Sequence, residues 1–172
     1  MSLLRQTPPA ARWQTLVEQA PERLALDVGG LCLSRADFES TIASQASALA
    51  SEGIGLCDVV AWLGINTPQM LATLFACERL GAVFMPLNWR LANDELQTIV
   101  QHAGVRTVCG SADMTARMAL LRDAVVQGGG FVSGAAEPGD LMLVYTSGTT
   151  GRPKGAMHTA TGMVANATVA IA

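Results

Sequence analysis

Short apolar runs alternate along this chain with longer segments in which apolar residues recur every three or four positions. An uninterrupted apolar run with β-branched residues, such as Val59–Leu63, is typical of a strand that is covered on both faces. Strands of this kind belong to parallel sheets, because crossover helices cover both sides. The runs predict four strands, at Val59–Leu63, Val83–Met85, Val105–Cys109 and Leu141–Tyr145.

The segments between the strands carry helix signals. Ser34 is a predicted N-cap with Asp37 three residues later, and Thr67 with Pro68 marks another helix start. Glycines after the periodic stretches are stop signals. Helices are predicted after Ser34 with Phe38, Ile42 and Leu49 inward, after Thr67 with Leu71, Leu74 and Phe75 inward, and at Glu95–His102, Ala112–Val126 and Thr159–Ala172.

The order of these elements predicts the fold class. Strands that alternate with helices favour a mostly parallel sheet flanked by helices on both faces, which is an α/β fold. Two shorter runs, Leu24–Asp27 and Leu31–Leu33, flank a pair of glycines. They predict a small hairpin ahead of the sheet.

The composition is poor in charge. Half of the 172 residues are hydrophobic, 15% are charged, and the net charge is −3. An ordinary soluble domain has about 25% charged residues. A surface that meets a membrane or partner would explain the deficit, and so would a piece of a longer protein. We favour the longer protein, because the last predicted helix ends on an apolar face.

Several classes of function are disfavoured. Lysines and arginines are scattered, whereas a nucleic-acid-binding protein gathers them on one face. The four cysteines form no CxxC pair, which predicts buried free thiols in a reducing compartment. Two histidines are too few for a metal site with those cysteines. The longest apolar stretches are interrupted by charged residues, so no transmembrane segment is predicted.

The strongest chemical signal is the segment Tyr145–Gly155. It places closely spaced hydroxyls among three glycines and ends in Pro153, Lys154 and Gly155. Hydroxyls and glycine N–H groups donate to phosphate oxygens without bulk, and lysine adds a point charge, so the segment suits a triphosphate. Pro153 disfavours a helix before Lys154. We therefore predict a strand–loop–strand hairpin with a strand at Lys154–His158, and neither a Walker loop nor a GxSxG nucleophile elbow.

These residues resemble the signature of the adenylate-forming superfamily, which includes acyl-CoA synthetases, luciferases and the adenylation domains of peptide synthetases. A second stretch, Gly81–Leu91, is similar to another block of that family. Ala92 departs from the family pattern, which usually has a capping threonine there, so Asn93 is the expected cap. Ala160 departs as well, because a histidine is common after the threonine. The sequence Ser-Gly-Thr-Thr within the signature is more similar to that of acyl- or aryl-CoA synthetases than to that of peptide synthetases.

The resemblance implies that residues 1–172 are an incomplete, N-terminal portion of the AMP-binding domain, within the large N-terminal domain of such an enzyme, with the C-terminal domain absent. It implies ATP-dependent activation of a carboxylic acid to an acyl-adenylate, followed by thioester formation with coenzyme A. ATP, Mg²⁺ and coenzyme A are the implied cofactors. Fatty acid metabolism and a cytoplasmic location are the implied setting.

The phosphate-binding residues implied by the resemblance are Thr146, Ser147, Gly148, Thr149, Thr150, Gly151 and Lys154. The resemblance assigns no catalytic residue and no metal ligand to this chain, which is expected to be inactive alone. Asn88 and Arg90 are expected to be structural anchors. Expected partners are the carboxylic acid, ATP, coenzyme A and the remainder of the polypeptide, with a homo-oligomer left open. Two alternatives also stay open, namely a stand-alone nucleotide-binding module and a fragment of a peptide-synthetase adenylation domain.

Overall fold

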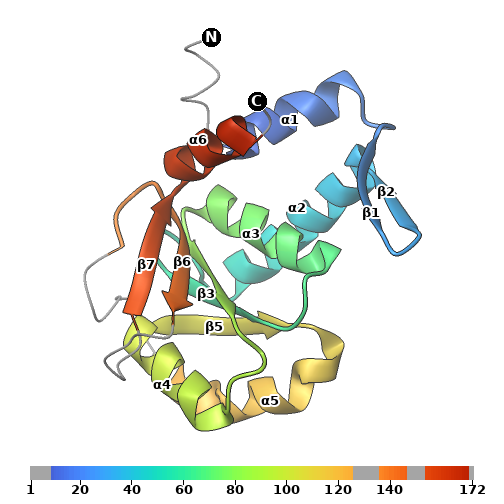
Figure 1. The fold of residues 1–172 in the computed structure, drawn as a ribbon. Helices are drawn as coiled ribbons and strands as arrows, with labels where there is room; N and C mark the ends of the chain where they lie inside the picture. Colours follow the sequence, from blue (N-terminus) through green and yellow to red (C-terminus); the bar gives the residue numbers. More distant parts are fainter. Residues whose placement is uncertain (1–8, 126–135, 147–153, 171–172) are drawn as a thin grey trace.

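The computed structural model describes residues 9–125, 136–146 and 154–170. Within these residues the centre is a sheet of five strands (Figure 1), namely β3 (Val59–Leu63), β4 (Val83–Leu87), β5 (Val105–Gly110), β6 (Asp140–Thr146) and β7 (Lys154–Thr159). The strand order is β5-β3-β4-β6-β7. The first four run parallel, and β7 runs antiparallel to β6. The predicted mostly parallel α/β fold is therefore confirmed.

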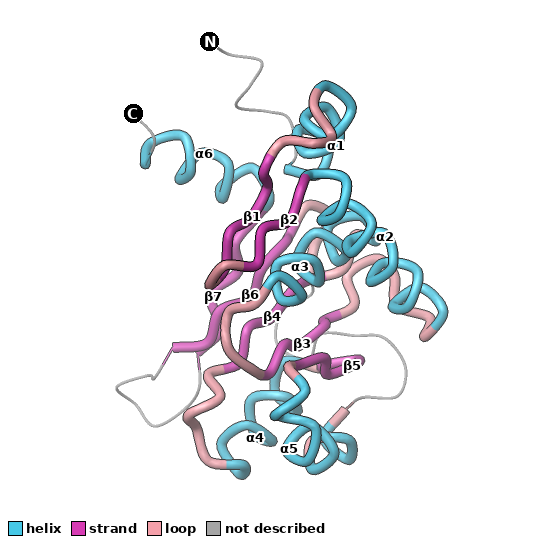
Figure 2. The backbone as a smooth tube through the Cα atoms, turned by 90° about the vertical axis from the view of Figure 1, so that its right-hand side faces the viewer, coloured by secondary structure: helices cyan, strands magenta, loops and turns pink. Residues whose placement is uncertain are grey.

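Helices cover both faces of this sheet, as Figures 1 and 2 show. α2 (Arg35–Ser51) and α3 (Pro68–Leu80) lie on one face. α4 (Asn93–Ala103) and α5 (Thr115–Leu120) lie on the other. In both views, α1 (Pro9–Gln19) and α6 (Ala160–Ala170) lie at the end of the molecule farthest from α4 and α5.

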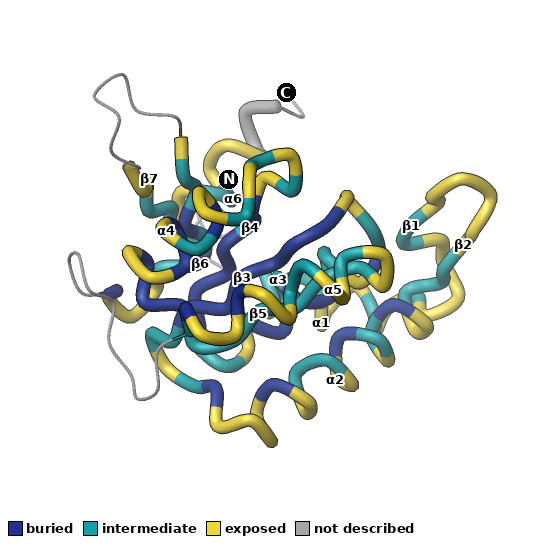
Figure 3. Tube along the Cα trace, turned by 90° about the horizontal axis from the view of Figure 1, so that it is seen from below, coloured by how far each residue is buried: buried dark blue, intermediate teal, exposed yellow. Residues whose placement is uncertain are grey.

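The central strands bury both of their faces, because successive side chains of a strand point to opposite sides. Val59, Ala61 and Leu63 of β3 pack in the core that includes α4. Val60 and Trp62 pack in the core that includes α2 and α3. All five are buried, and Figure 3 shows β3 and β4 as the buried centre of the molecule. The continuous apolar run in the sequence therefore has a direct structural cause.

A two-stranded antiparallel ribbon, β1 (Leu24–Val28) and β2 (Leu31–Ser34), precedes the sheet as predicted. Ser34 then starts α2 through the predicted capping box. The Asp37 N–H donates to Ser34 Oγ at 3.1 Å, and the Ser34 N–H donates to Asp37 Oδ2 at 3.1 Å. These bonds satisfy two N–H groups that the first helical turn would otherwise leave unpaired.

The sequence pattern did not predict α1. None of its residues is fully buried, and its short apolar stripe of Ala10, Trp13 and Val17 is only half-buried. Hydrogen bonds attach its backbone to the body, from the Ala10 N–H to Glu78 Oε1 at 3.0 Å and from Arg35 to the Leu16 carbonyl at 2.6 Å. The Trp13 ring meets Phe38 and Phe75 edge-on, with centroids 5.4 and 5.9 Å away, and Trp13 Nε1 donates to Glu39 Oε2 at 2.9 Å.

The predicted continuous helix over Ala112–Val126 is wrong. The chain forms a 3₁₀ turn (Ala112–Met114), then α5, then a second 3₁₀ turn (Arg122–Ala124), and Val126 lies outside the described residues. Leu121 and Ala124 are both buried in the core. Residues three apart line up in a 3₁₀ turn, so this tighter geometry directs both side chains into the core.

The predicted inward face of α3 is wrong in part. Leu71, Leu74 and Phe75 are only half-buried, whereas Ala72 and Ala76 are fully buried. Small residues occupy the closest approach of α3 to its neighbours, and the larger ones surround that contact. Hydrophobic size therefore gave the wrong ranking of burial, although the face itself is correct.

The predicted cap of α4 is also wrong. Ala92 is the N-cap, and Asn93 is the first helical residue. Asn93 Oδ1 accepts a hydrogen bond from Arg117 Nε at 2.9 Å, so it serves a tertiary contact. The Glu95 carboxylate caps the helix by accepting the Ala92 N–H at 2.9 Å.

The cysteines were predicted to be buried, and this is correct only for Cys77. Cys57 and Cys109 are half-buried, and Cys32 is exposed. Cys32 lies on β2 of the small ribbon, which is covered less completely than the central sheet. An apolar stretch alone does not tell which sheet a strand joins.

Helix α6 covers most of the predicted final helix. Val164 of its predicted apolar face is buried, Met163 is half-buried and Ala167 is exposed. Ile171, the fourth residue of that face, lies outside the described residues. The helix is therefore confirmed over Ala160–Ala170, and its face in part.

Candidate functional site

The predicted phosphate segment lies on the hairpin of β6 and β7. Thr146 is the last residue of β6, Lys154 is the first of β7, and the two are paired across the hairpin. Both side chains are exposed. The prediction that Lys154 opens a strand is confirmed. Five further predicted residues lie outside the described ones, namely Ser147, Gly148, Thr149, Thr150 and Gly151.

The end of β6 shares an edge of the sheet with the ends of two other strands. Because β3, β4 and β6 are parallel, their carboxyl ends point the same way. Ligands of open α/β sheets bind outside the carboxyl ends of the strands. Thr146, which ends β6, therefore lies on the edge where a ligand is expected.

A cavity of about 430 Å³ opens at the ends of β3 and β4. Its lining includes Trp62 and Asn66 from the β3 side and Asn88, Trp89 and Arg90 from the β4 side. The Arg90 guanidinium stacks on the Trp89 ring, 4.3 Å from its centroid. The wall thus combines aromatic, amide and cationic groups, as small-molecule sites commonly do.

The turn after β4 is held from two directions. Asn88 Oδ1 accepts the Arg90 N–H at 3.1 Å, and the Asn88 carbonyl accepts the Leu91 N–H at 3.1 Å. Arg117 of α5 donates to the carbonyls of Trp89 and Leu91, the latter at 2.6 Å. Asn88 is therefore a structural anchor as expected, whereas Arg90 is exposed at the cavity.

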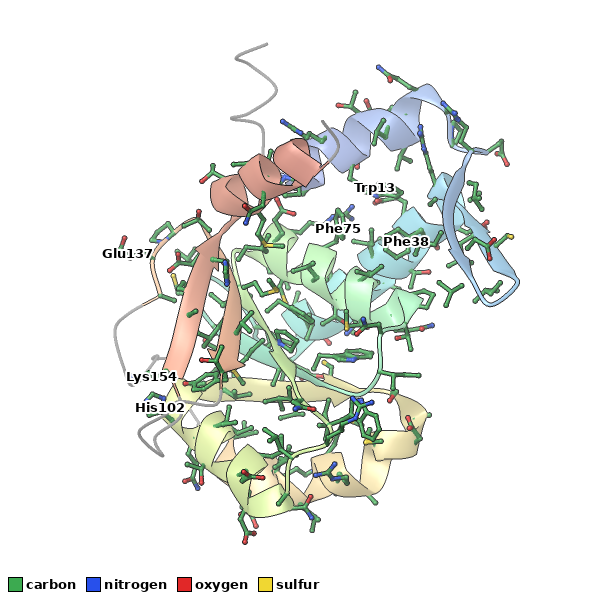
Figure 4. The ribbon with its side chains drawn as sticks, viewed as in Figure 1. Trp13, Phe38, Phe75, His102, Glu137 and Lys154 are labelled. Atoms are coloured by element: carbon green, nitrogen blue, oxygen red, sulfur yellow. The ribbon has the colours of Figure 1, made fainter. Side chains whose placement is uncertain are left out.

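Tyr145, next to Thr146, is hydrogen-bonded to His102 of α4. Its hydroxyl and Nδ1 of His102 share a hydrogen bond of 2.6 Å. The two rings meet edge to face, with centroids 5.8 Å apart. Burial raises the pKa of the Tyr145 phenol, which therefore stays protonated at neutral pH. Figure 4 labels His102 and Lys154 at the same end of the hairpin.

The sequence did not identify His102 or Arg117 as contributors to this edge. His102 precedes Tyr145 by 43 positions, and Arg117 follows Trp89 by 28. Pattern-based reasoning has no access to pairs so far apart. The available signals were weak: a histidine in the last turn of a predicted helix, and an arginine within an otherwise apolar segment.

Lys154 is the single lysine of the chain, and the other ten basic residues are arginines. A lysine at the first position of β7 adds a cation on a flexible stem beside Thr146. Among the described residues, no group of three His, Cys, Asp or Glu side chains is arranged to hold a metal ion. None of the described helices is long and apolar enough to cross a membrane.

A second cavity, of about 460 Å³, lies beside β5. It is lined by Glu52, Thr107 and Arg122, among others, and borders β5 at the opposite edge of the sheet from β7. Thr107 Oγ1 donates to Glu52 Oε2 at 3.0 Å. The described residues of the predicted phosphate segment, including Thr146 and Lys154, do not line it.

Comparison with known proteins identifies the family of this chain. The profile of the family described as AMP-binding enzyme matches residues 13–171. An indoleacetate–CoA ligase of Aromatoleum aromaticum is 39% identical over an alignment of 150 residues that covers 73% of this chain and 29% of the relative. A feruloyl-CoA synthase of an Amycolatopsis species is 39% identical over an alignment of 151 residues that covers 81% of this chain and 31% of the relative.

A solved structure agrees with these sequence relatives. The N-terminal domain of FACL13 from Mycobacterium tuberculosis superposes with a TM-score of 0.75 at 25% identity. The superposition covers 90% of this chain and 45% of that one. The chain thus spans about a third of the length of the curated relatives and about half of this structural neighbour. Because the family profile extends over nearly all residues, from the ribbon through the β6–β7 hairpin, the chain belongs to the family of AMP-binding enzymes.

Proposed function

We propose that residues 1–172 form the N-terminal portion of the AMP-binding domain of a longer adenylate-forming enzyme, which joins a carboxylic acid to coenzyme A. The family match supports adenylate chemistry. The names of the two relatives, a CoA ligase and a CoA synthase, support coenzyme A as the acceptor. The observation that carries the proposal is the complete signature Tyr145–Gly155 in the sequence, together with the pairing of Thr146 and Lys154 between β6 and β7.

The proposed first step activates the acid. A carboxylate oxygen attacks the α-phosphorus of ATP, the bond from that phosphorus to the bridging oxygen breaks, and pyrophosphate leaves. In this step Thr146, Ser147, Gly148, Thr149, Thr150 and Gly151 donate to the β- and γ-phosphates, and Lys154 adds positive charge. These groups act by position and electrostatics, because charge develops on the leaving pyrophosphate.

The proposed second step transfers the acyl group. The sulfur of coenzyme A attacks the acyl carbon of the adenylate, the bond to AMP breaks, and a thioester forms. No described residue of this chain is assigned as a nucleophile or general base. The acid–base groups for this step are therefore sought in the remainder of the polypeptide.

Magnesium would enter with the phosphates of ATP. The described residues hold no cluster of acidic, histidine or cysteine side chains that fits the ion. We therefore assign no metal ligand to this chain. A cytoplasmic location and a homo-oligomer remain predictions.

We further propose an aromatic acid as the substrate. Indoleacetate and ferulate, for which the two relatives are named, are both aromatic carboxylic acids. The relatives share 39% identity with this chain, so their names favour an aryl acid over the fatty acid that the resemblance first implied. Acid-dependent exchange of labelled pyrophosphate into ATP, measured with indoleacetate, ferulate and a straight-chain acid, discriminates the two classes. Exchange with the straight-chain acid alone would contradict an aryl substrate.

Lys154→Ala tests the assigned phosphate contact in the complete enzyme. A hydrogen bond to a charged group contributes enough to change a rate or affinity about 10- to 100-fold. We therefore expect kcat/KM for ATP in the exchange reaction to fall by about that factor, with little change in KM for the acid. Lys154→Arg keeps the charge and is expected to retain more activity. Unchanged exchange in Lys154→Ala would remove Lys154 from the site.

Calorimetry separates this function from a stand-alone nucleotide-binding module. If the chain contributes only the phosphate contacts, ATP binds it weakly when the remainder of the polypeptide is missing. A micromolar affinity of the 172-residue chain for ATP would instead favour the module.

A further inference from the structure

The carboxyl end of β6 extends beyond the register pair that joins β6 to its parallel neighbour β4. The register between β4 and β6 joins Phe84 to Met142, which lies four residues before Thr146, and among the described residues it is the single register pair of these strands. The last residues of β6 are instead paired with β7. A side-chain contact from another element would add a further tie between the base of the phosphate segment and the body of the molecule.

The Tyr145 side chain contacts both β7 and α4. Across the hairpin it is paired with Gly155, and its ring occupies the space where a side chain of residue 155 would lie. A Cβ at Gly155 would lie 3.3 Å from Tyr145 Cε2 and Cζ and 2.8 Å from Leu143 Cδ1. The ring thus lies over Gly155 near the start of β7, next to the Thr146–Lys154 pair.

On its other side, Tyr145 is tied to α4. The hydrogen bond to His102 Nδ1 is 2.6 Å long. α4 is itself firmly placed, because Leu96, Ile99 and Val100 are buried in the core. His102 lies in the last turn of that helix, just before Ala103 and the C-cap Gly104. It connects a fixed helix to the strand end from which the phosphate segment begins.

We propose that His102 is a positioning residue of the phosphate site: its bond to Tyr145 holds Thr146 and Lys154 in register for ATP. This inference rests on the proposed function, since it assigns a role toward the same phosphates. His102 touches no phosphate itself and acts through Tyr145. A group that positions a ligand contact in this way is expected to change the use of ATP and to leave the use of the acid unchanged.

Two variants each remove the bond and keep an aromatic ring, His102→Phe and Tyr145→Phe. In the complete enzyme, each is expected to lower kcat/KM for ATP in pyrophosphate exchange about fivefold, the factor that one typical hydrogen bond contributes. The double variant is expected to fall no further, because both changes remove the same bond. Gln101→Ala, an exposed neighbour of His102 on α4, is the matched control and is expected to leave exchange unchanged.

Binding of magnesium pyrophosphate, measured by calorimetry on the same variants, does not depend on catalysis. His102→Phe and Tyr145→Phe are expected to weaken it about fivefold, and Gln101→Ala not at all. If the wild type binds pyrophosphate in a His102-dependent way but exchanges none into ATP, the proposed function fails and the positioning role stands. Unchanged pyrophosphate affinity in both variants, additive losses in the double variant, or an equal rise in KM for the acid would each overturn the positioning role.

Discussion

At the scale of single residues, glycine is required where the ends of β3 and the edge strand β5 meet. Gly110 of β5 is paired with Leu63 of β3. A Cβ at Gly110 would lie 2.3 Å from the Leu63 carbonyl oxygen and 2.6 Å from Met118 Sδ. The first of these contacts is with backbone, which has no alternative rotamer to adopt.

Gly110→Ala is therefore expected to destabilise the protein by about 2 kcal/mol, the usual cost of overpacking a core. Urea unfolding followed by circular dichroism measures the loss as a lower midpoint. Gly55→Ala is the matched control, because no atom lies within 4 Å of its added Cβ and its backbone is not left-handed. Equal midpoints for the two variants would contradict the close approach at Gly110.

The residues of the site differ in how far the sequence predicted them. The residue types and spacing of Tyr145–Gly155 predicted the strand that begins at Lys154, which is confirmed, and a phosphate segment, which stays a prediction. The role of Gly155 in making room for the Tyr145 ring was not predictable, because it depends on the hairpin register. His102 was not predictable either, since its partner lies 43 positions away.

At the scale of elements, Arg117 joins α5 to the turn between β4 and α4. It donates to Asn93 Oδ1 at 2.9 Å, to the Leu91 carbonyl at 2.6 Å and to the Trp89 carbonyl. The planar guanidinium matches three acceptors at once, which an ammonium group on a longer stem does not. One side chain thus fixes the wall of the 430 Å³ cavity.

Arg117→Ala is expected to destabilise the protein by about 2 kcal/mol, because it leaves two half-buried carbonyls without their donors. Arg117→Lys is expected to recover less than half of that loss. The denaturation midpoint gives the size of the effect, and the fluorescence of the nearby Trp89 reports whether the turn has moved. Arg122→Ala removes an exposed arginine of the following 3₁₀ turn and serves as the control. A midpoint shift as large in Arg122→Ala would contradict the specific role of Arg117.

Elements differed in how well their patterns predicted them. β3 was predicted over its full range, because a strand covered on both faces has no polar position to interrupt the run. α1 was not predicted, because its contacts with the body come from residues that are distant in the chain. The segment 112–124 was predicted as one helix and is divided in three, since its side chains follow the shape of the core beneath β5.

At the scale of the whole molecule, the burial of the cysteines differs between the central sheet and the small ribbon. Burial raises the pKa of the Cys77 thiol far above its ordinary value, and burial raises that of Cys109 to about 11. Both thiols therefore stay protonated and unreactive near neutral pH, since the thiolate is the nucleophile. Cys32, on the ribbon, is exposed.

We expect Cys32 to react first with a thiol reagent at pH 8, and Cys77 and Cys109 to react only as the protein unfolds. Both raised pKa values also make stability fall as the pH rises above about 9, because the unfolded chain then loses protons that the folded chain retains. Peptide mapping by mass spectrometry after timed labelling measures each rate. Modification of Cys77 as fast as Cys32, without loss of helical signal, would contradict the closed core.

The sequence by itself determined the α/β class, the parallel strands and the strand that begins at Lys154. Each depends on residues that are close in the chain, where periodicity, caps and glycine spacing act directly. The tertiary structure decided which side chains meet across the layers. It placed His102 against Tyr145, Arg117 against the turn after β4, and small alanines at the closest contact of α3. These choices depend on how the layers pack, and packing brings together residues between which the chain carries no local signal.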